Sequence, residues 1–351
     1  MPHIHGNSDD RTNRVVYLDI LRIICILFVI FNHTRTEGVE LYTLCTVNTF
    51  DYWGSIFIAI LCKVAVPVFF MISGVTLLSK TENLKTFYVK RVLRFALVIV
   101  VFTFLQYLRI YRVHPEDGFS LKTWLINVYA GNIIEPYWFL KSYFSFLLIV
   151  PILRILVKNM EQKHFLYLIA LKGVELLLFI IMIISGYLAN LSFPLNTDII
   201  FYPLFGYYLG NVIRLGEKKR IGSWMYALIC ILSVALIAVW DTLMYVRTGS
   251  HQPGVHQAFT WILAGLFFMS FRFVEVKKVQ VRRVIASVGG AVFGTYLIED
   301  VVRNQFEFLY PLLVPYTGGI LCAVIFTLVS ALTGLAVIYL LRLIPFVRKL
   351  I

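Results

Sequence analysis

Three ionisable side chains stand inside the first apolar run of the chain, VVYLDILRIICILFVIFNHT, which covers residues 15–34. Asp19, Arg22 and His33 would each be costly in hydrocarbon unless they are paired or used in chemistry. On an α-helix the eleven steps from Arg22 to His33 turn about 1100°, so the two side chains share a face, and Asp19 is within ion-pair reach of Arg22. A carboxylate, a guanidinium and an imidazole on one face could bind an anion and move a proton. The structural alternative is an ion pair that neutralises itself and an imidazole that only reaches the outer membrane interface.

A second group of candidates follows further along the chain. The run KVAVPVFFMISGVTLL places Ser73 and Gly74 close to its inner end, and small residues let a helix or a ligand approach closely. The next segment, FYVKRVLRF, carries Arg91 and Arg94. Two guanidinium groups on one helical face could hold phosphate oxygens in bidentate fashion. The alternative for these arginines is simple anchoring of the inner loop.

Polar residues also gather where two other apolar runs reach the outer side. Glu135, Trp138 and Lys141 lie in NIIEPYWFLKSYFSFL, and Glu299 lies in FGTYLIEDVV. We interpret these four as candidates for binding a substrate, although aromatic residues at this depth are also expected of an interfacial belt.

The elements that must position these residues are membrane-spanning helices. With 60% hydrophobic and 15% charged residues, the 351-residue chain is far more apolar than a soluble domain. Runs long enough to cross about 30 Å of hydrocarbon predict an all-α bundle of about ten transmembrane helices. The predicted spans are 15–34, 54–78, 92–111, 138–157, 166–187, 197–214, 222–245, 256–273, 286–305 and 317–343.

Basic residues predict the orientation of these spans. With the N-terminus inside, the inner segments hold twenty-two of the 32 Lys and Arg residues and the outer segments hold six. This bias places both termini in the cytoplasm. We therefore expect a cytoplasmic tail over 1–14, a single transmembrane domain over 15–345 and a second tail over 346–351. The net charge of +13 fits inner loops held at an anionic leaflet, so no nucleic-acid partner is expected.

Five motifs together carry a resemblance to a known family. Arg22-x10-His33 within LDILR…H, VPVFFMISG, KRVLR, YWFL and YLI occur in the order seen in the acyltransferase 3 family of integral membrane proteins. The resemblance implies an O-acyltransferase that moves an acyl group, commonly acetyl, from cytoplasmic acyl-CoA to a hydroxyl of an extracytoplasmic glycan or lipid-linked sugar. It also implies a multi-pass protein of a cell membrane, with a bacterial cytoplasmic membrane as the expected location.

The resemblance suggests a role for each candidate residue. Arg22, Arg91 and Arg94 would hold the phosphates of acyl-CoA. Ser73 and Gly74 would shape the path of its pantetheine arm.

The remaining residues of the stripe would act at its two ends. His33 would take the proton from the acceptor hydroxyl, and Asp19 would orient Arg22. Members of the family often carry a histidine after the YLI motif. Glu299 and Asp300 stand there in this chain, which leaves the role of that position open.

Two further expectations complete the prediction. His3 and His5 are a weak indication of metal binding, so acyl-CoA is expected as the donor without a metal centre. A transporter or flippase of a glycan precursor is the alternative function, because buried charges and helices interrupted by Pro or Gly, as in FYPLFGYYLGN, also occur in transporters.

Overall fold

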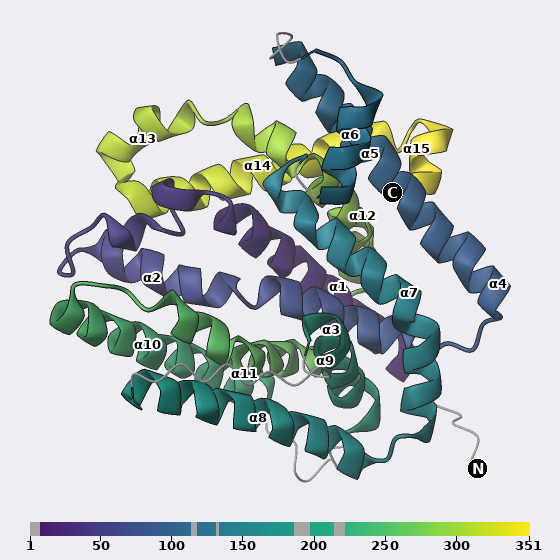
Figure 1. Cartoon of the computed structure of the whole chain (residues 1–351), viewed down its shortest axis with the longest axis horizontal. Helices are drawn as coiled ribbons and strands as arrows, with labels where there is room; N and C mark the ends of the chain where they lie inside the picture. Colours follow the sequence, from purple (N-terminus) through teal and green to yellow (C-terminus); the bar gives the residue numbers. More distant parts are fainter. Residues whose placement is uncertain (1–7, 114–117, 131–132, 186–196, 214–221) are drawn as a thin grey trace. The chain divides into compact units, whose positions relative to one another are not determined.

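The computed structural model describes residues 8–113, 118–130, 133–185, 197–213 and 222–351, and these residues form helices without a strand (Figure 1). The α-helices are α1 Ser8–Asn32, α2 Phe50–Cys62, α3 Ala65–Leu77, α4 Leu84–Phe87, α5 Arg94–Val113, α6 Leu121–Ala130, α7 Trp138–Asn159, α8 Gln162–Ser185, α9 Asp198–Tyr207, α10 Ser223–Thr248, α11 Pro253–Arg272, α12 Val279–Asn304, α13 Leu309–Thr317, α14 Gly319–Leu341 and α15 Pro345–Leu350. Short 3₁₀ turns cover Arg35–Glu37, Leu41–Thr43 and Glu135–Tyr137, and π-helical turns cover Tyr88–Leu93 and Tyr208–Val212. The predicted all-α fold class is confirmed.

Eight helices of the described residues are long and apolar enough to cross a membrane, where the sequence predicts ten spans. The two predicted spans outside this set are 15–34 and 197–214. The first forms most of α1, whose side chains are described only from Val16 onward. The second forms the ten residues of α9 and the five of the following π-helical turn, which is shorter than a full span. Pro203 and the glycines of this run explain the weak helix, since Pro removes a hydrogen-bond donor and Gly lowers helix propensity.

The contacts of the chain divide it into two compact units. The first unit comprises Met1–Val75 and Glu161–Tyr339, and the second comprises Thr76–Met160 and Leu340–Ile351. Each unit is described by itself below.

Close packing of α1 against α12 organises the first unit. A Cβ atom added at Gly289 of α12 would lie 2.6 Å from the Cβ of Asp19 on α1, so the helices meet there because position 289 lacks a side chain. Near the far ends of the same two helices, His33 lies beside Glu299. The two helices therefore run in the same direction along each other.

Small residues also allow α3 and α9 to cross closely within the first unit. A Cβ at Gly74 would lie 1.9 Å from the carbonyl oxygen of Pro203, and one at Gly206 would lie 2.3 Å from the carbonyl oxygen of Met71. Backbone therefore meets backbone at this crossing, as in other membrane helix pairs.

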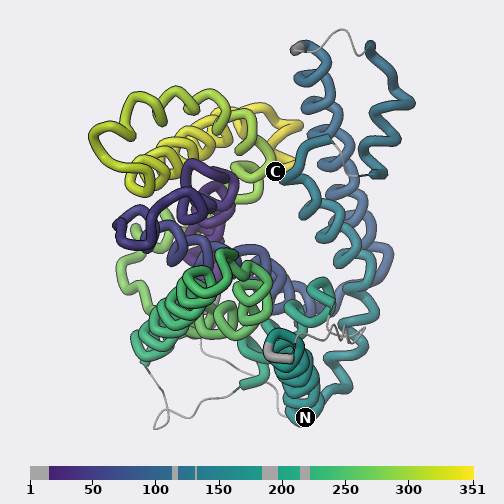
Figure 2. Tube along the Cα trace, turned by 60° about the vertical axis from the view of Figure 1, so that its left-hand side comes forward, coloured from purple at the N-terminus to yellow at the C-terminus, as the bar shows by residue number. Residues whose placement is uncertain are grey.

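A hairpin of α10 and α11 packs on the same unit (Figures 1 and 2). Gly249 ends α10 in the left-handed conformation, at φ 72°, which glycine adopts without steric cost. Pro253 then opens α11 at the first helical turn, where no backbone donor is needed.

The second unit is built from α4 to α7 and α15. Asn83 caps α4 by accepting a hydrogen bond from the backbone N–H of Lys85 at 2.9 Å. The Arg94 side chain donates a hydrogen bond to the carbonyl oxygen of Leu350, near the C-terminus, and this bond joins α5 to α15.

Cys45 provides a test of the predicted orientation, because the other four cysteines are buried and Cys45 is partly exposed. We expect a membrane-impermeant maleimide added outside intact cells to label Cys45. Burial, and then the nearby Asp51 carboxylate, raise the pKa of the thiol above its usual value. Since the thiolate is the reactive form, labelling should be slow at pH 7 and should quicken as the pH rises to about 9. The measurement is the labelled fraction by mass spectrometry, with Cys45→Ser as the control. Labelling that requires permeabilised cells would overturn the inside placement of the N-terminus.

Candidate active site

The inner part of the predicted stripe on α1 is an ion pair. Arg22 donates a hydrogen bond to Asp19, as the three-residue spacing predicts. Asp19 is buried against α12, whereas the Arg22 side chain keeps 31% of its surface exposed. The carboxylate is thus fixed in the bundle and holds a guanidinium that other groups can still reach.

The outer end of the stripe pairs an imidazole with a carboxylate. The Nδ1 atom of His33 lies 2.8 Å from Oε1 of Glu299, and the Glu299 side chain is almost wholly buried, at 1% exposure. His33 retains 17% exposure. The carboxylate therefore belongs to the protein interior, and the imidazole lies between it and the surroundings of the bundle.

The guanidinium of Arg303 lies beside the carboxylate of Glu299 and belongs to the same group of side chains. Nε of Arg303 lies 3.6 Å from Oε2 of Glu299, and its NH2 group donates to Oδ1 of Asp300 at 3.1 Å. One helical turn of α12 thus supplies Glu299, Asp300 and Arg303. The positive charge offsets one of the two carboxylates that face it.

This arrangement is suited to general acid–base chemistry. The two groups are within ion-pair distance without hydrogen-bond geometry, and a small rotation that aligned them would orient the imidazole and favour the tautomer with the proton on Nδ1. The Nε2 atom of His33 is then free to accept a proton from a hydroxyl. The sequence predicts Glu299 as a substrate-binding residue, which stays a prediction, and its contact with His33 is one that the sequence prediction did not include.

The predicted phosphate-binding arginines lie in the second unit, each with its own partner. Nε of Arg91 donates to Oε1 of Glu82 at 2.8 Å, and Nε of Arg94 donates to the carbonyl oxygen of Leu350 at 3.2 Å. The π-helical turn Tyr88–Leu93 separates their directions, because a π turn rotates less per residue than the α-helix that the sequence predicts. The two guanidinium groups therefore have different surroundings.

Arg154 of α7 is a basic residue of this region to which the sequence analysis gives no binding role. Its NH2 group donates to Oε1 of Glu82 at 2.8 Å, the atom that also accepts from Arg91. The hydrogen bonds from the two arginines lower the pKa of Glu82 to about 2.

Ser73 and Gly74 lie within the helix crossing of the first unit. The Ser73 hydroxyl donates to the carbonyl oxygen of Phe69, one turn earlier, at 2.9 Å. Close approach to Pro203 explains the glycine at 74 by packing. Their predicted part in shaping a ligand path stays a prediction.

Three of the predicted substrate-binding residues lie in the second unit. Glu135 begins the 3₁₀ turn that precedes α7, and Trp138 is the first residue of α7 with 49% exposure. The Lys141 amino group donates to the carbonyl oxygen of Tyr129 at 3.0 Å. All three side chains are exposed, and their predicted role stays a prediction.

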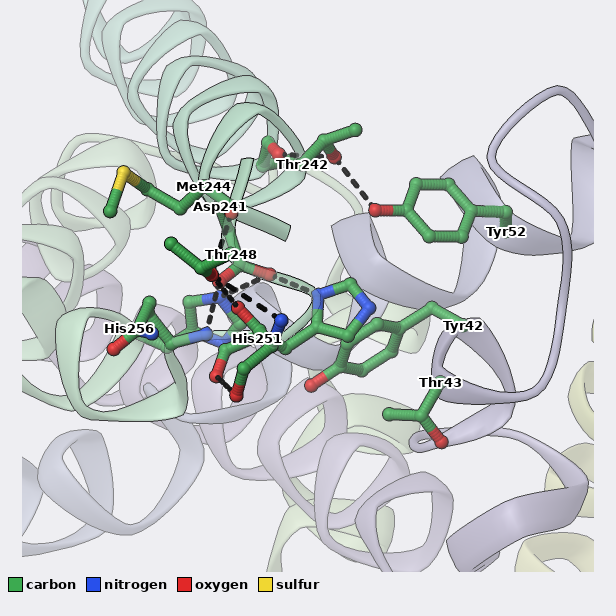
Figure 3. A network of polar contacts seen from close by, with 12 residues as sticks. Tyr42, Thr43, Tyr52, Asp241, Thr242, Met244, Thr248, His251 and His256 are labelled. Atoms are coloured by element: carbon green, nitrogen blue, oxygen red, sulfur yellow. Dashed lines mark hydrogen bonds and ion pairs between the residues drawn. The ribbon is translucent and has the colours of Figure 1, made fainter. Parts of the chain in front are cut away.

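A further polar cluster, absent from the sequence prediction, fastens the α10–α11 hairpin (Figure 3). Asp241 is fully buried, and its Oδ2 atom lies 2.7 Å from Nδ1 of His251 and 3.7 Å from Nε2 of His256. Its Oδ1 atom accepts from the backbone N–H of Gln252 at 2.6 Å. Tyr42, in the turn that follows α1, packs edge-on against His251 at 4.8 Å.

The signal for this cluster is a single Asp in an apolar run followed by two histidines, VALIAVWDTLMY and SHQPGVH. His256 is 1% exposed and Asp241 has no exposed surface, so a substrate the size of a sugar has no access to them. The cluster instead ties the hairpin to the turn Leu41–Thr43.

No group of three or more metal-ligating side chains occurs in the described part of the chain, and His3 and His5 lie outside it.

Comparison with known proteins identifies the family of the chain. A family model described as an acyltransferase domain, Acyl_transf_3, matches residues 15–339. No curated protein and no solved structure matches the chain. The matched region contains His33 and Glu299, and it leaves out only residues 1–14 and 340–351. The chain therefore belongs to the acyltransferase 3 family and is a multi-pass membrane acyltransferase.

Proposed function

We propose that the protein is an O-acyltransferase that uses cytoplasmic acyl-CoA, in particular acetyl-CoA, and acylates a hydroxyl of an extracytoplasmic glycan or lipid-linked sugar. The observation that supports this proposal most strongly is the 2.8 Å approach of His33 to Glu299. An imidazole with a buried carboxylate behind it is the arrangement needed to activate a hydroxyl.

The proposed reaction proceeds by direct attack. Nε2 of His33 removes the proton as the acceptor oxygen forms a bond to the thioester carbonyl carbon. The tetrahedral intermediate then collapses, the carbon–sulfur bond breaks, and the departing thiolate takes the proton from His33. The products are the O-acyl ester and CoA with a free thiol.

The charges around His33 favour the proton transfer. Glu299 is almost wholly buried, and its Oε1 atom lies 2.8 Å from Nδ1 of His33, so a carboxylate stands directly beside the group that gains the proton. The buried Glu299 carboxylate thus stabilises the imidazolium formed in the transition state more than the neutral ground state.

Binding of the donor is the proposed role of the arginines. Arg91 and Arg94 hold phosphate groups of CoA, and Arg22 offers a further cation within the first unit. Acyl-CoA carries several phosphate charges, and guanidinium groups suit them because they donate two parallel hydrogen bonds.

Two substitutions test the proposed catalytic pair. His33→Ala should lower kcat for CoA release from acetyl-CoA, with water as acceptor, by about 10²- to 10⁴-fold, the range for loss of a general base. Glu299→Gln keeps the shape of the side chain but removes its charge, and should lower kcat by roughly 10²-fold. In both variants the KM for acetyl-CoA should stay within about twofold of the wild type, because neither substitution removes a proposed phosphate contact. The measurement is steady-state kinetics of purified protein in nanodiscs.

Glu307→Gln is the matched control for Glu299→Gln, since Glu307 is an exposed carboxylate beyond the end of α12. Its kcat should equal that of the wild type. A folded His33→Ala protein, judged by an unchanged Tm, that retains normal kcat would show that His33 is not the base. An equal fall in kcat in Glu299→Gln and Glu307→Gln would show that the effect is not specific to Glu299 and would contradict its proposed role.

Substitution of the arginines should affect binding instead. Arg91→Ala and Arg94→Ala should each raise the KM for acetyl-CoA by about tenfold, the loss of one charge-assisted contact at a partly exposed site, and leave kcat nearly unchanged. Lys158→Ala, at an exposed position near the end of α7, is the control for loss of one positive charge. An equal effect of Lys158→Ala, or a fall in kcat without a change in KM, would count against phosphate binding by these arginines.

A further inference from the structure

In the second unit, a single carboxylate, that of Glu82, contacts the guanidinium groups of two arginines. Glu82 lies in the connection between α3 and α4, and its Oε1 atom accepts from Nε of Arg91 and from NH2 of Arg154, each at 2.8 Å. Its Oε2 atom lies 3.5 Å from NH2 of Arg91. One carboxylate therefore serves two guanidinium groups, and one positive charge remains in excess.

Arg154 is held in place by contacts other than Glu82. Its Nε donates to the carbonyl oxygen of Leu77 at 2.9 Å, and its guanidinium carbon lies 4.7 Å from the centre of the Phe87 ring. Only 12% of the side chain is exposed. The guanidinium is thus oriented before any ligand arrives, which lowers the entropy cost of binding one.

The Glu82 side chain can move away from the two arginines without disrupting a helix, because Glu82 lies between the end of α3 and the start of α4. Its lowered pKa, about 2, means that it stays ionised at every pH at which the protein would be assayed. Only another anion can therefore replace it between the two arginines. A phosphate monoester, with up to two negative charges and three acceptor oxygens, balances two guanidinium groups where one carboxylate balances only one.

We propose that Arg91 and Arg154 form a phosphate-binding site in which Glu82 is the resident counter-ion that a phosphate group displaces. The inference rests on the proposed function, in which Arg91 binds the acyl donor, and it adds Arg154 as a binding residue and Glu82 as an internal competitor. The phosphate can come from the donor nucleotide or from an anionic lipid headgroup, and the experiment below separates these sources.

The direction in which one substitution changes phosphate affinity distinguishes this site from a structural ion-pair cluster. Glu82→Gln removes the competing charge and leaves both arginines in the protein. A displaced counter-ion predicts that phosphate binds more tightly to this variant. A purely structural tie predicts equal or weaker binding, because the arginines lose the group that positions them.

The test is isothermal titration of the purified full chain, in nanodiscs of neutral phosphatidylcholine, with adenosine 3′,5′-bisphosphate. Glu82→Gln should lower the Kd by about 3- to 10-fold, a modest effect because the pair is partly exposed. Arg154→Lys keeps the charge but loses the planar fork, and should raise the Kd by about tenfold. Lys158→Ala, at an exposed position on α7, should leave the Kd within twofold of the wild type. Binding should weaken as the salt concentration rises.

A second arm uses nanodiscs that contain phosphatidylglycerol, with lipid retention read by native mass spectrometry. If Glu82→Gln strengthens and Arg154→Lys weakens retention of this lipid, and neither alters nucleotide binding, the phosphate site stands with a lipid headgroup as its occupant. The proposed role of Arg91 in donor binding would then be wrong, whereas the expected fall of kcat in His33→Ala would not be affected. If Glu82→Gln leaves both affinities unchanged or weaker, or if Arg154→Lys binds as the wild type does, the proposed site is overturned.

Discussion

Charge inside an apolar helix bundle must be neutralised where it lies, and the pairing of α1 with α12 meets this constraint for the first unit. Asp19 is buried beside Gly289 and holds Arg22, while His33 lies beside Glu299. A shift of one helix along the other would place a side chain against Asp19 and separate Glu299 from His33. The same contacts that make the polar groups tolerable therefore also fix the distance between the proposed base and its carboxylate.

The two ends of the proposed reaction make different electrostatic demands. Around His33, a buried carboxylate lies 2.8 Å from a group that gains a proton in the proposed reaction. Around Glu82, two guanidinium groups share one carboxylate, which suits an anionic ligand.

The sequence predicts contacts within a helix well and contacts between helices poorly. The Asp19–Arg22 pair follows from a spacing of three residues, and the helical fold class follows from long apolar runs. The approach of Glu299 to His33 depends on which spans are neighbours, and helical periodicity carries no such information. The sequence gives Arg154 no binding role for the same reason, since its partner Glu82 belongs to another element.

Local irregularities explain the other differences. The sequence predicts that Arg91 and Arg94 share a helical face, which assumes α-helical rotation through a segment that forms a π turn instead. The run 197–214 looks like a full span by hydropathy, but its described part is one short helix and a π turn. The buried Asp241 cluster requires a turn that brings His251 back onto α10, and Gly249 and Pro253 mark that turn only once the helix ends are known.

The central claim is that the protein transfers an acyl group to a surface glycan, with His33, positioned by Glu299, as the general base. It is tested most directly by mass spectrometry of glycans from cells that lack the protein and are supplied with the wild type or with His33→Ala at equal membrane abundance. We expect the wild type to restore an ester-linked acyl group that is lost on mild alkaline treatment, and His33→Ala to leave the glycan unmodified. Equal acylation by the two proteins, or no acylation by either, would contradict the account.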